Sequence, residues 1–368
     1  MLFLFYIFMT CILIQTAFAV WMLWTLPSST HKINQESSID KGLSIIICAK
    51  NEAQNVEKNL PHILNQRHPN YEIIVVNDAS EDETGLVLQH FAAQYDHLNI
   101  INIPLDEEHQ LPGKKWALSK GVAAAKNENI LLCDADCSPT SPYWAELMGT
   151  ALQDPIEIVA GYGAYTSTKN CLNVFIRWET LHTFLQYSTY TYSGIPYMAV
   201  GRNLACTKSI LLEAQKDPLW ATMPSGDDDL LIRLKATKSN MSILADNKAF
   251  TLSEAKVNVK DWLSQKQRHL STGKLYKKHI QFLLGIYAVS HGLMWLLWII
   301  LFFAGKGYLI SSMMMLRCIL VWSLWAISAE NLKEKKLMLF LPLCDIAWAF
   351  YNLILSPYIF YKTKKQWK

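Results

Sequence analysis

The chain carries little charge for its length. Asp, Glu, Lys and Arg make up 18% of its 368 residues, against roughly a quarter in ordinary soluble proteins. This low share excludes a disordered or acidic-tail protein. The formal net charge is only +3, so no bulk positive field indicates nucleic acid, and no nucleic-acid partner is expected. Hydrophobic residues reach 51% and include 13 Trp, which indicates a chain that lies partly in lipid.

Several common motifs are missing. No GxGxxG or GxxxxGK[ST] segment follows a strand-like run, which excludes a dinucleotide fingerprint and a P-loop. No CxxC pair occurs among the eight cysteines. Cys133 and Cys137 flank an acidic pair but lack the partner ligands of a zinc site. We expect eight free thiols, because reducing compartments disfavour a disulfide framework.

Long apolar stretches stand at both ends. Residues 1–24 carry no charge and are long enough to cross a bilayer, so they predict a transmembrane anchor. A signal peptide, the alternative, needs a basic start and a shorter apolar core. Three further stretches follow near the other end, at about 281–304, 307–328 and 337–361. The last contains Asp345 and two prolines, which leaves open whether it spans fully. Arg317 and Asp345 are hypothesised to pair across a hairpin, with snorkelling as the alternative.

The basic residues predict an orientation. Segment 256–280 includes QKQRHLSTGKLYKKH, and the positive-inside rule puts it in the cytoplasm. Its Val, Leu and Trp residues between Lys and Arg predict an amphipathic segment on the anionic leaflet. The basic tail YKTKKQWK would lie outside if the last stretch crosses fully, which stays open. The predicted organisation is an anchor at 1–24, a cytoplasmic domain at 41–255, the interface segment and a membrane region of two or three spans at 281–362.

The central domain reads as α/β. Four apolar, strand-like runs recur at intervals of about 30 residues, the length of a βαβ unit. They are 44–48, 72–76, 99–103 and 129–133. Near-continuous apolar runs suit parallel strands buried on both faces. Helical stretches fit between them at 53–66, 83–93 and 115–126. The sequence therefore predicts a mixed, mostly parallel sheet flanked by helices.

Carboxylates follow three of these runs. Glu52 follows the first, Asp78 the second, and Asp134 with Asp136 the fourth. Ligands of open α/β sheets gather beyond the carboxyl ends of the strands. Turn formation and helix capping explain one such cluster easily and three less well. Residues i and i+2 of an extended segment point the same way, so Asp134 and Asp136 predict a site for Mg²⁺ or Mn²⁺.

Three more segments complete the set. Lys114 opens a helix, where a lysine suits a phosphate. Asp227 and Asp228 lie in a run of three acids after Gly226, which is more than helix capping requires. Gln265, Arg268 and His269 fall at i, i+3 and i+4, on one helix face. By itself this last group also fits a solvated basic face.

Taken in order, these motifs resemble the membrane-bound family-2 glycosyltransferases, such as the ceramide glucosyltransferase-like and cellulose synthase-like enzymes. The resemblance covers about residues 43–275. It implies a GT-A fold and an inverting transfer from a nucleotide-sugar. It also implies a role for each matched position. Glu52 and Asp78 hold the base and ribose, Lys114 contacts the nucleotide or its diphosphate, Asp134 and Asp136 bind the metal, and Gln265, Arg268 and His269 match the Gln-x-x-Arg-Trp motif.

The resemblance matches Asp228 to the general base. Asp227 replaces the usual Glu, so either of the two acids could be the base, and His269 replaces the usual Trp. We therefore predict a metal-dependent hexosyltransferase that moves a sugar, with UDP as the commonest nucleotide of the family, to a lipid or lipid-linked hydroxyl at the cytoplasmic face of a bacterial inner membrane. Two alternatives stay open, a processive polysaccharide synthase and a non-catalytic nucleotide-sugar-binding subunit.

Overall fold

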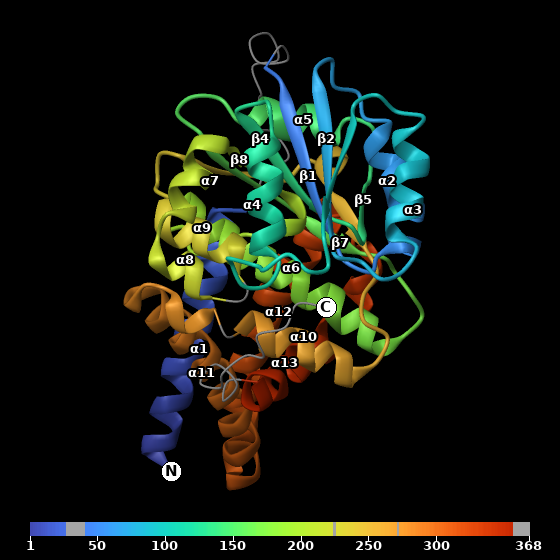
Figure 1. The fold of residues 1–368 in the computed structure, drawn as a ribbon. Coiled ribbons are helices and arrows are strands. Elements are labelled where there is room, and N and C mark those ends of the chain that lie inside the picture. Colours follow the sequence, from blue (N-terminus) through green and yellow to red (C-terminus); the bar gives the residue numbers. More distant parts are fainter. Residues whose placement is uncertain (27–40, 224–225, 271, 356–368) are drawn as a thin grey trace. The chain divides into compact units, whose positions relative to one another are not determined.

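A computed structural model describes residues 1–26, 41–223, 226–270 and 272–355 (Figure 1). The chain divides into two units. Unit 1 consists of Met1–Leu26, Ser167–Thr189 and Lys256–Lys362, and unit 2 of Pro27–Thr166, Tyr190–Ala255 and Thr363–Lys368. Ser167–Thr189 thus belongs to unit 1, although it lies within the predicted domain 41–255. The boundaries of the predicted domains stay a prediction.

Unit 2 is built on a seven-stranded sheet. The strand order is β3-β2-β1-β4-β8-β6-β9, and β1, β2, β3 and β4 run parallel. Strand β8 is antiparallel to both of its neighbours. The strands are β1 (Leu43–Ala49), β2 (Tyr71–Asp78), β3 (Leu98–Ile103), β4 (Asn129–Asp134), β6 (Ile158–Gly161), β8 (Leu204–Thr207) and β9 (Met241–Leu244). The prediction of a mixed, mostly parallel sheet is confirmed.

A second sheet of three short strands has the order β5-β10-β7. Its strands are β5 (Cys137–Pro139), β7 (Gly163–Tyr165) and β10 (Thr251–Ser253). Strand β5 follows β4 after the two residues Ala135 and Asp136, so the predicted metal-binding motif lies at the turn between the two sheets. Pairing between β5 and β10 holds this turn from one side.

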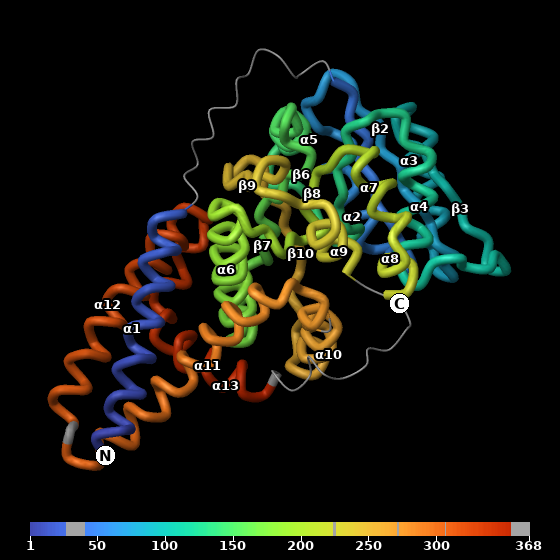
Figure 2. Tube along the Cα trace, turned by 90° about the vertical axis from the view of Figure 1, so that its left-hand side faces the viewer, coloured from blue at the N-terminus to red at the C-terminus, as the bar shows by residue number. Residues whose placement is uncertain are grey.

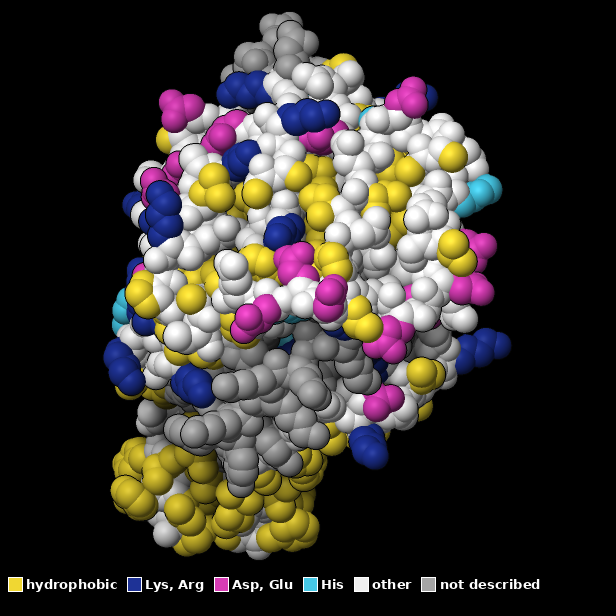
Figure 3. All heavy atoms as spheres, viewed as in Figure 1, with side chains coloured by type: hydrophobic (Ala, Val, Ile, Leu, Met, Phe, Trp, Pro, Cys, Tyr) yellow, Lys and Arg dark blue, Asp and Glu magenta, His cyan; other side chains and the backbone are white. Residues whose placement is uncertain are grey.

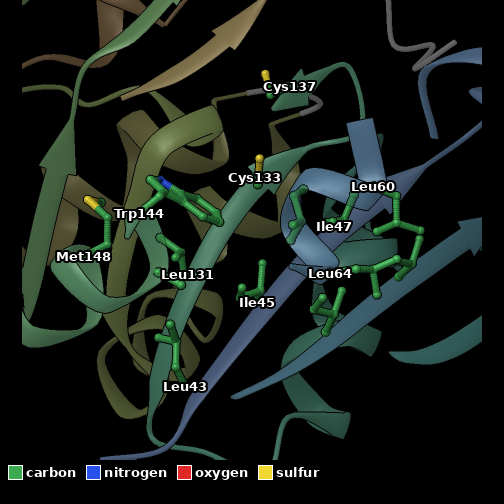
Figure 4. Close-up of a cluster of buried hydrophobic side chains, with 14 of the residues drawn as sticks. Leu43, Ile45, Ile47, Leu60, Leu64, Leu131, Cys133, Cys137, Trp144 and Met148 are labelled. Carbon is green, nitrogen blue, oxygen red and sulfur yellow. The ribbon is translucent and has the colours of Figure 1, made fainter. Parts of the chain in front are cut away.

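The helices of unit 2 cover both faces of the large sheet. Side chains of α2, α3 and α5 form one core with Ile45 and Ile47 of β1 and Val75 of β2 (Figure 4). Helix α4 packs against β1 and β2 (Figure 1). Gly121 of α4 lies so close to Ile46 that an added Cβ would be 2.6 Å from the Ile46 Cγ2 atom. The helices are α2 (Ala53–Leu64), α3 (Thr84–Ala92), α4 (Lys115–Ala124), α5 (Trp144–Ala151), α7 (Lys208–Gln215), α8 (Pro218–Thr222) and α9 (Asp227–Lys235).

Unit 1 is helical. Four of its helices, at Leu2–Trp24, Lys278–Gly305, Gly307–Asn331 and Lys335–Ile354, are long and apolar enough to cross a membrane. They correspond to α1 (Leu2–Trp24), α11 (Lys278–Leu301), α12 (Gly307–Asn331) and α13 (Leu341–Leu355) with the short turns beside them. Helix α1 lies beside α11 and α12 although it is far from them in sequence (Figure 2). The predicted apolar helices at both ends are confirmed.

The outer surface of these helices is apolar. Phe3, Tyr6, Phe282 and Leu316 are among many large hydrophobic side chains that are more than half exposed, and such side chains gather where α1, α11 and α12 lie (Figure 3). An apolar surface of this size marks a lipid-facing or protein-facing area. Residues 356–361 of the last predicted stretch and the basic tail lie outside the described residues.

The interior of the four-helix group is partly polar. Arg317 of α12 and Asp345 of α13 form a fully buried ion pair, as hypothesised from the sequence. Asp345 also lies 2.7 Å from Nε2 of His291 and accepts the Trp322 Nε1–H at 3.0 Å. Gln15 of α1 accepts a hydrogen bond from Arg317 at 3.2 Å. This network links α1, α11, α12 and α13, and each of its charged side chains has a polar partner within it, as charged residues inside a membrane usually do.

The remaining helices of unit 1 are α6 (Cys171–Tyr192), whose last residues belong to unit 2, and α10 (Val259–Leu270). Helix α10 packs on α6 and α13 through the Trp262 ring, which lies 5.8 Å from Phe175 and 5.7 Å from Tyr351. Lys266 of α10 pairs with the buried Glu179 of α6. The predicted helix carrying Gln265, Arg268 and His269 is therefore present, and those residues lie along it.

Candidate active site

The carboxyl ends of β1, β2 and β4 bring the predicted acids to one edge of the sheet. The three strands are parallel neighbours, and Cys48 near the end of β1 is in register with both Val76 and Asp134. Each strand therefore ends at nearly the same height, and the segments that follow share one edge. The sequence-based expectation of converging strand ends is confirmed by this register.

Several polar residues at this edge hold the loops rather than face a ligand. Asn51 donates its backbone N–H to Ser80 Oγ at 2.9 Å, and its side chain accepts the Glu81 N–H at 2.8 Å. Asp82 accepts the Ala53 N–H at 3.1 Å. These bonds tie the loop after β1 to the loop after β2, so for these residues turn formation is the role that the structure supports.

Glu52 precedes α2 and is held from two directions. Its backbone N–H donates to Thr84 Oγ1 at 2.9 Å, and its carboxylate accepts a hydrogen bond from the Asn55 side chain. The carboxylate is thus fixed beside the first turn of α2, between the loops that follow β1 and β2.

Asp78 differs from these loop-forming residues. It is the last residue of β2 and is fully buried. Neither carboxylate oxygen meets the geometry of a hydrogen bond with any described residue. The nearest positive or titratable groups are His109, whose Nε2 lies 3.0 Å from Oδ1, and Lys50, whose Nζ lies 4.0 Å from Oδ2. Burial raises the pKa of Asp78 above its usual range, although His109 and Lys50 oppose this. A buried carboxylate without backbone donors is costly and is not explained by capping.

The motif after β4 brings together three atoms that are able to coordinate a metal ion. One carboxylate oxygen of Asp134, one of Asp136 and the Cys137 sulfur all lie within 4.8 Å of one another. The Cys137 thiol donates to Asp136 Oδ1 at 3.2 Å. Burial and the neighbouring Asp134 charge raise the pKa of Asp136. Two carboxylates facing one spot are the arrangement that the spacing of Asp134 and Asp136 predicted.

Lys114 pairs with Asp134. Burial disfavours the charged amine, but the carboxylates of Asp134 and Asp227 outweigh it and raise the pKa of Lys114 well above its usual range. Lys114 thus stays positively charged beside the candidate metal ligands Asp134 and Asp136. Its position directly before the first turn of α4 is the one that the sequence predicted.

The acids before α9 lie at the start of that helix. Gly226 precedes them with φ +75, a backbone conformation that favours glycine. Asp228 accepts the Gly201 N–H on Oδ2 at 2.8 Å and the Asp229 N–H on Oδ1 at 2.8 Å. Burial, together with the Asp227 charge, raises the pKa of Asp228 to about 6. The electrostatic effect of Asp227 on Lys114 and of Asp134 on Asp228 links these acids to the motif after β4.

Four residues were not assigned a role from the sequence. Lys50 and His109 face Asp78. The buried Lys115 donates to the carbonyls of Trp220 and Met223 at 2.9 and 2.8 Å. Arg202 lies over the Tyr165 ring at 4.2 Å. Lys50 and Lys115 adjoin predicted site residues and could have been included on that ground, whereas His109 and Arg202 lie in connections without a pattern that marks them.

Gln265, Arg268 and His269 belong to unit 1, whereas the acids belong to unit 2. The structure therefore brings Glu52, Asp78, Lys114, Asp134, Asp136, Asp227 and Asp228 together in one unit, and describes the α10 residues within the other.

Comparison with known proteins identifies the class. Residues 44–199 match the family Glycosyl transferase family 2. The glycosyltransferase AglE of Haloferax volcanii is 29% identical over 126 residues, which cover 34% of this chain and 40% of AglE. The beta-monoglucosyldiacylglycerol synthase of Trichormus variabilis is 31% identical over 101 residues, which cover 27% of this chain and 21% of that protein.

A solved structure has the same fold. The mannosyltransferase PcManGT of Pyrobaculum calidifontis, in complex with GDP-Man and Mn²⁺, aligns with a TM-score of 0.59 at 14% identity over 95% of this chain and 98% of that one. Residues 44–199 thus match a family-2 glycosyltransferase domain, the fold is of the GT-A type, and the described residues include four helices able to span a membrane. The chain covers less than half the length of the curated relatives named above.

Proposed function

We propose that the protein is an inverting glycosyltransferase that moves a sugar from a nucleotide-diphosphate donor, with UDP as the first nucleotide to test, to a lipid or lipid-linked hydroxyl. The observation that carries the proposal is the grouping of Asp134, Asp136 and Cys137 within 4.8 Å, in the same unit as Asp78, Lys114 and Asp228. Capping or turn formation accounts for single acids at strand ends, but it gives no reason for this convergence.

The chemistry of the donor set fits a divalent cation. Asp134 and Asp136 would hold Mg²⁺ or Mn²⁺ through oxygen atoms, which these ions prefer. The hydrogen bond with Cys133, burial and nearby negative charge raise the pKa of the Cys137 thiol well above its usual range, so it stays protonated and favours no thiophilic metal. When bound, the cation would neutralise charge on the diphosphate leaving group. PcManGT, which shares the fold, was solved with Mn²⁺.

The protein's own residues would do the rest of the work. Glu52 and Asp78 would hold the base and ribose. Lys114, positive and next to Asp134, would contact the diphosphate and stabilise its growing charge. The family resemblance adds Gln265, Arg268 and His269 as donor-contacting residues.

Asp228 is the proposed general base. It would accept the proton of the acceptor hydroxyl as that oxygen attacks the anomeric carbon and the bond to the nucleotide diphosphate breaks. A single displacement of this kind inverts the anomeric centre. A pKa raised to about 6 suits this role, because a base works best when its pKa lies near the working pH. The backbone N–H groups of Gly201 and Asp229 fix the carboxylate.

A lipid-borne acceptor fits the rest of the chain. The four helices of the described residues that could cross a membrane are too few to line a wide polymer channel in one copy. The relative from Trichormus variabilis is named for a glycolipid product. Basic residues in 256–280 support a cytoplasmic active site, as in a bacterial inner-membrane enzyme, by the positive-inside rule.

The test is product analysis. Purified protein is incubated with Mn²⁺, a membrane lipid extract and each of several radiolabelled nucleotide-sugars. The proposal expects one lipid product that carries a single sugar of inverted configuration. A polymer would support the processive alternative. Failure to consume any donor with either Mn²⁺ or Mg²⁺ would contradict an enzymatic role and favour a binding subunit.

A further inference from the structure

The buried position of Asp78 conflicts with a role in binding a nucleotide unless something moves. Its carboxylate is fully buried, and both oxygens are without a hydrogen bond to any described residue. A ligand that donates an N–H to this carboxylate has to reach an atom that solvent does not reach. One of the groups now against the carboxylate must therefore leave first.

His109 is the group best placed to move. Lys50, the other partner of Asp78, follows directly on β1 and lies 4.0 Å from the carboxylate. His109 lies closer, at 3.0 Å, and belongs to the connection between β3 and α4, residues 104–114, which we call the β3–α4 loop. The described loop contains no helix or strand. Its position opposite Asp78 is the one that a donor group of a nucleotide base would take.

The same loop also contacts the candidate metal-binding motif at Asp134. It ends in Lys114, which pairs with Asp134. Gly113, between Pro112 and Lys114, has a φ of +64, so the chain turns sharply there through a conformation that favours glycine. One short loop therefore places a basic group on Asp78 and another on Asp134, the two carboxylates that the donor base and the cation need.

Glu107 anchors the first part of the loop on α4, and the His109 ring lies 6.4 Å from the Trp116 ring. Glu107 accepts the Trp116 Nε1–H at 3.1 Å and pairs with Lys120 at 2.9 Å, and both partners lie on α4. Lys120 lies over the Trp116 ring at 4.5 Å. The anchor holds the first part of the loop on α4 while 108–113, between Glu107 and Lys114, carries His109.

We propose that the β3–α4 loop is a lid that closes the donor site by placing His109 on Asp78 and Lys114 on Asp134, and that nucleotide and cation displace these two groups. This inference rests on the proposed function, since it concerns regulation of the same site. Nucleotide binds only to molecules in which the loop is open, so the apparent affinity is reduced in proportion to the fraction of open molecules. Cation and nucleotide displace contacts of one loop, so each favours binding of the other.

The test is the sign of the change in affinity in His109 variants. UDP and GDP are titrated calorimetrically into full-length protein in detergent, with and without Mn²⁺. His109→Ala should bind the preferred nucleotide about tenfold more tightly than the unmodified chain, because the closing contact is gone. His109→Gln, whose amide can also contact the Asp78 carboxylate, should bind like the unmodified chain. His62→Ala, a change at an exposed histidine of α2, should have no effect.

A second measurement follows the loop itself. Hydrogen exchange of residues 104–114 without ligand should be faster in His109→Ala than in the unmodified chain, with exchange in β1 and β2 unchanged, which also shows that the variant is folded. Weaker nucleotide binding by His109→Ala would overturn the lid, because His109 would then contact the nucleotide itself. Equal binding would also overturn it, because His109 would then have no effect on the donor site. If neither the unmodified chain nor His109→Ala binds UDP or GDP, the proposed function itself fails, which is a different result.

Discussion

The backbone N–H of Gly201 donates a hydrogen bond of 2.8 Å to the carboxylate of Asp228. Gly201 is the first residue of a short turn, Gly201–Asn203, that leads into β8. The third residue of this turn, Asn203, is fully buried and donates to the carbonyls of Tyr162 and Ala249 at 3.0 and 2.9 Å. The sheet core therefore fixes the Gly201 N–H, which holds one oxygen of the Asp228 carboxylate. A fixed carboxylate with a raised pKa is what a general base requires.

The first prediction concerns the base. Asp228→Asn should lower the transfer rate by roughly 10²–10⁴-fold, the usual worth of general-base help, while nucleotide-sugar affinity stays within a few-fold. Asp227→Asn is the matched control, since it changes the neighbouring acid of the same helix turn, and it should keep most of the rate. Single-turnover transfer and calorimetry measure the two effects. Loss of the rate in Asp227→Asn but not in Asp228→Asn would reverse the assignment.

The second prediction concerns pH. The pKa of Asp228 is raised to about 6, so the carboxylate becomes protonated, and inactive as a base, as the pH falls through that value. The transfer rate at saturating donor should drop about tenfold per pH unit below about 6. Asp227→Asn removes a like charge that raises this pKa, so its acidic limb should move to lower pH. A limb near pH 4 in the unmodified chain would contradict the assignment.

The third prediction concerns the cation. Asp136→Ala removes one of the three ligand-type atoms grouped after β4. The strengthening of UDP or GDP binding by Mn²⁺ should be lost in this variant, whereas the weaker binding without metal should change little. Glu146→Ala, an acid of α5 outside the site, is the control and should behave like the unmodified chain. An unchanged response to Mn²⁺ in Asp136→Ala would refute the metal site.

The fourth prediction concerns the membrane helices. Arg317→Met leaves Asp345 as a buried charge without its ion-pair partner, and breaking such a pair costs about 3–5 kcal/mol. The thermal midpoint in detergent should fall by several degrees. The exchanged pair Arg317→Asp with Asp345→Arg should recover only part of the loss, because His291 and Trp322 also contact Asp345 in its present place. No recovery at all would show that the pair itself contributes little.

The strands that carry the site could be predicted because each is a short, continuous apolar run, as in Leu43–Ala49 and Asn129–Asp134. Fully buried parallel strands need such runs, and the acids at their ends stand out against them. Strands β6 and β8 have only four residues each and were not identified, since so short a run gives no reliable period.

Other features depend on tertiary contacts. His109 lies in a loop between Pro104 and Pro112 without any repeating pattern, and only the fold brings it to Asp78. Helix α6 reads as ordinary domain sequence, yet Ser167–Thr189 belongs to the unit with the membrane helices. Arg177 of α6 pairs with the buried Glu334 there, a contact between residues too far apart in the chain for local sequence patterns to indicate.

The central claim is that the acids of unit 2 form one cation-dependent donor site. A thermal-shift screen of nucleotide-sugars on the detergent-solubilised chain, with and without Mn²⁺, tests this most directly. Ligands that bind only the folded protein raise its melting midpoint by mass action. The account predicts that at least one nucleotide-sugar raises the midpoint by several degrees when Mn²⁺ is present, and by clearly less without it. No shift with any donor, or the same shift without a divalent cation, would contradict it.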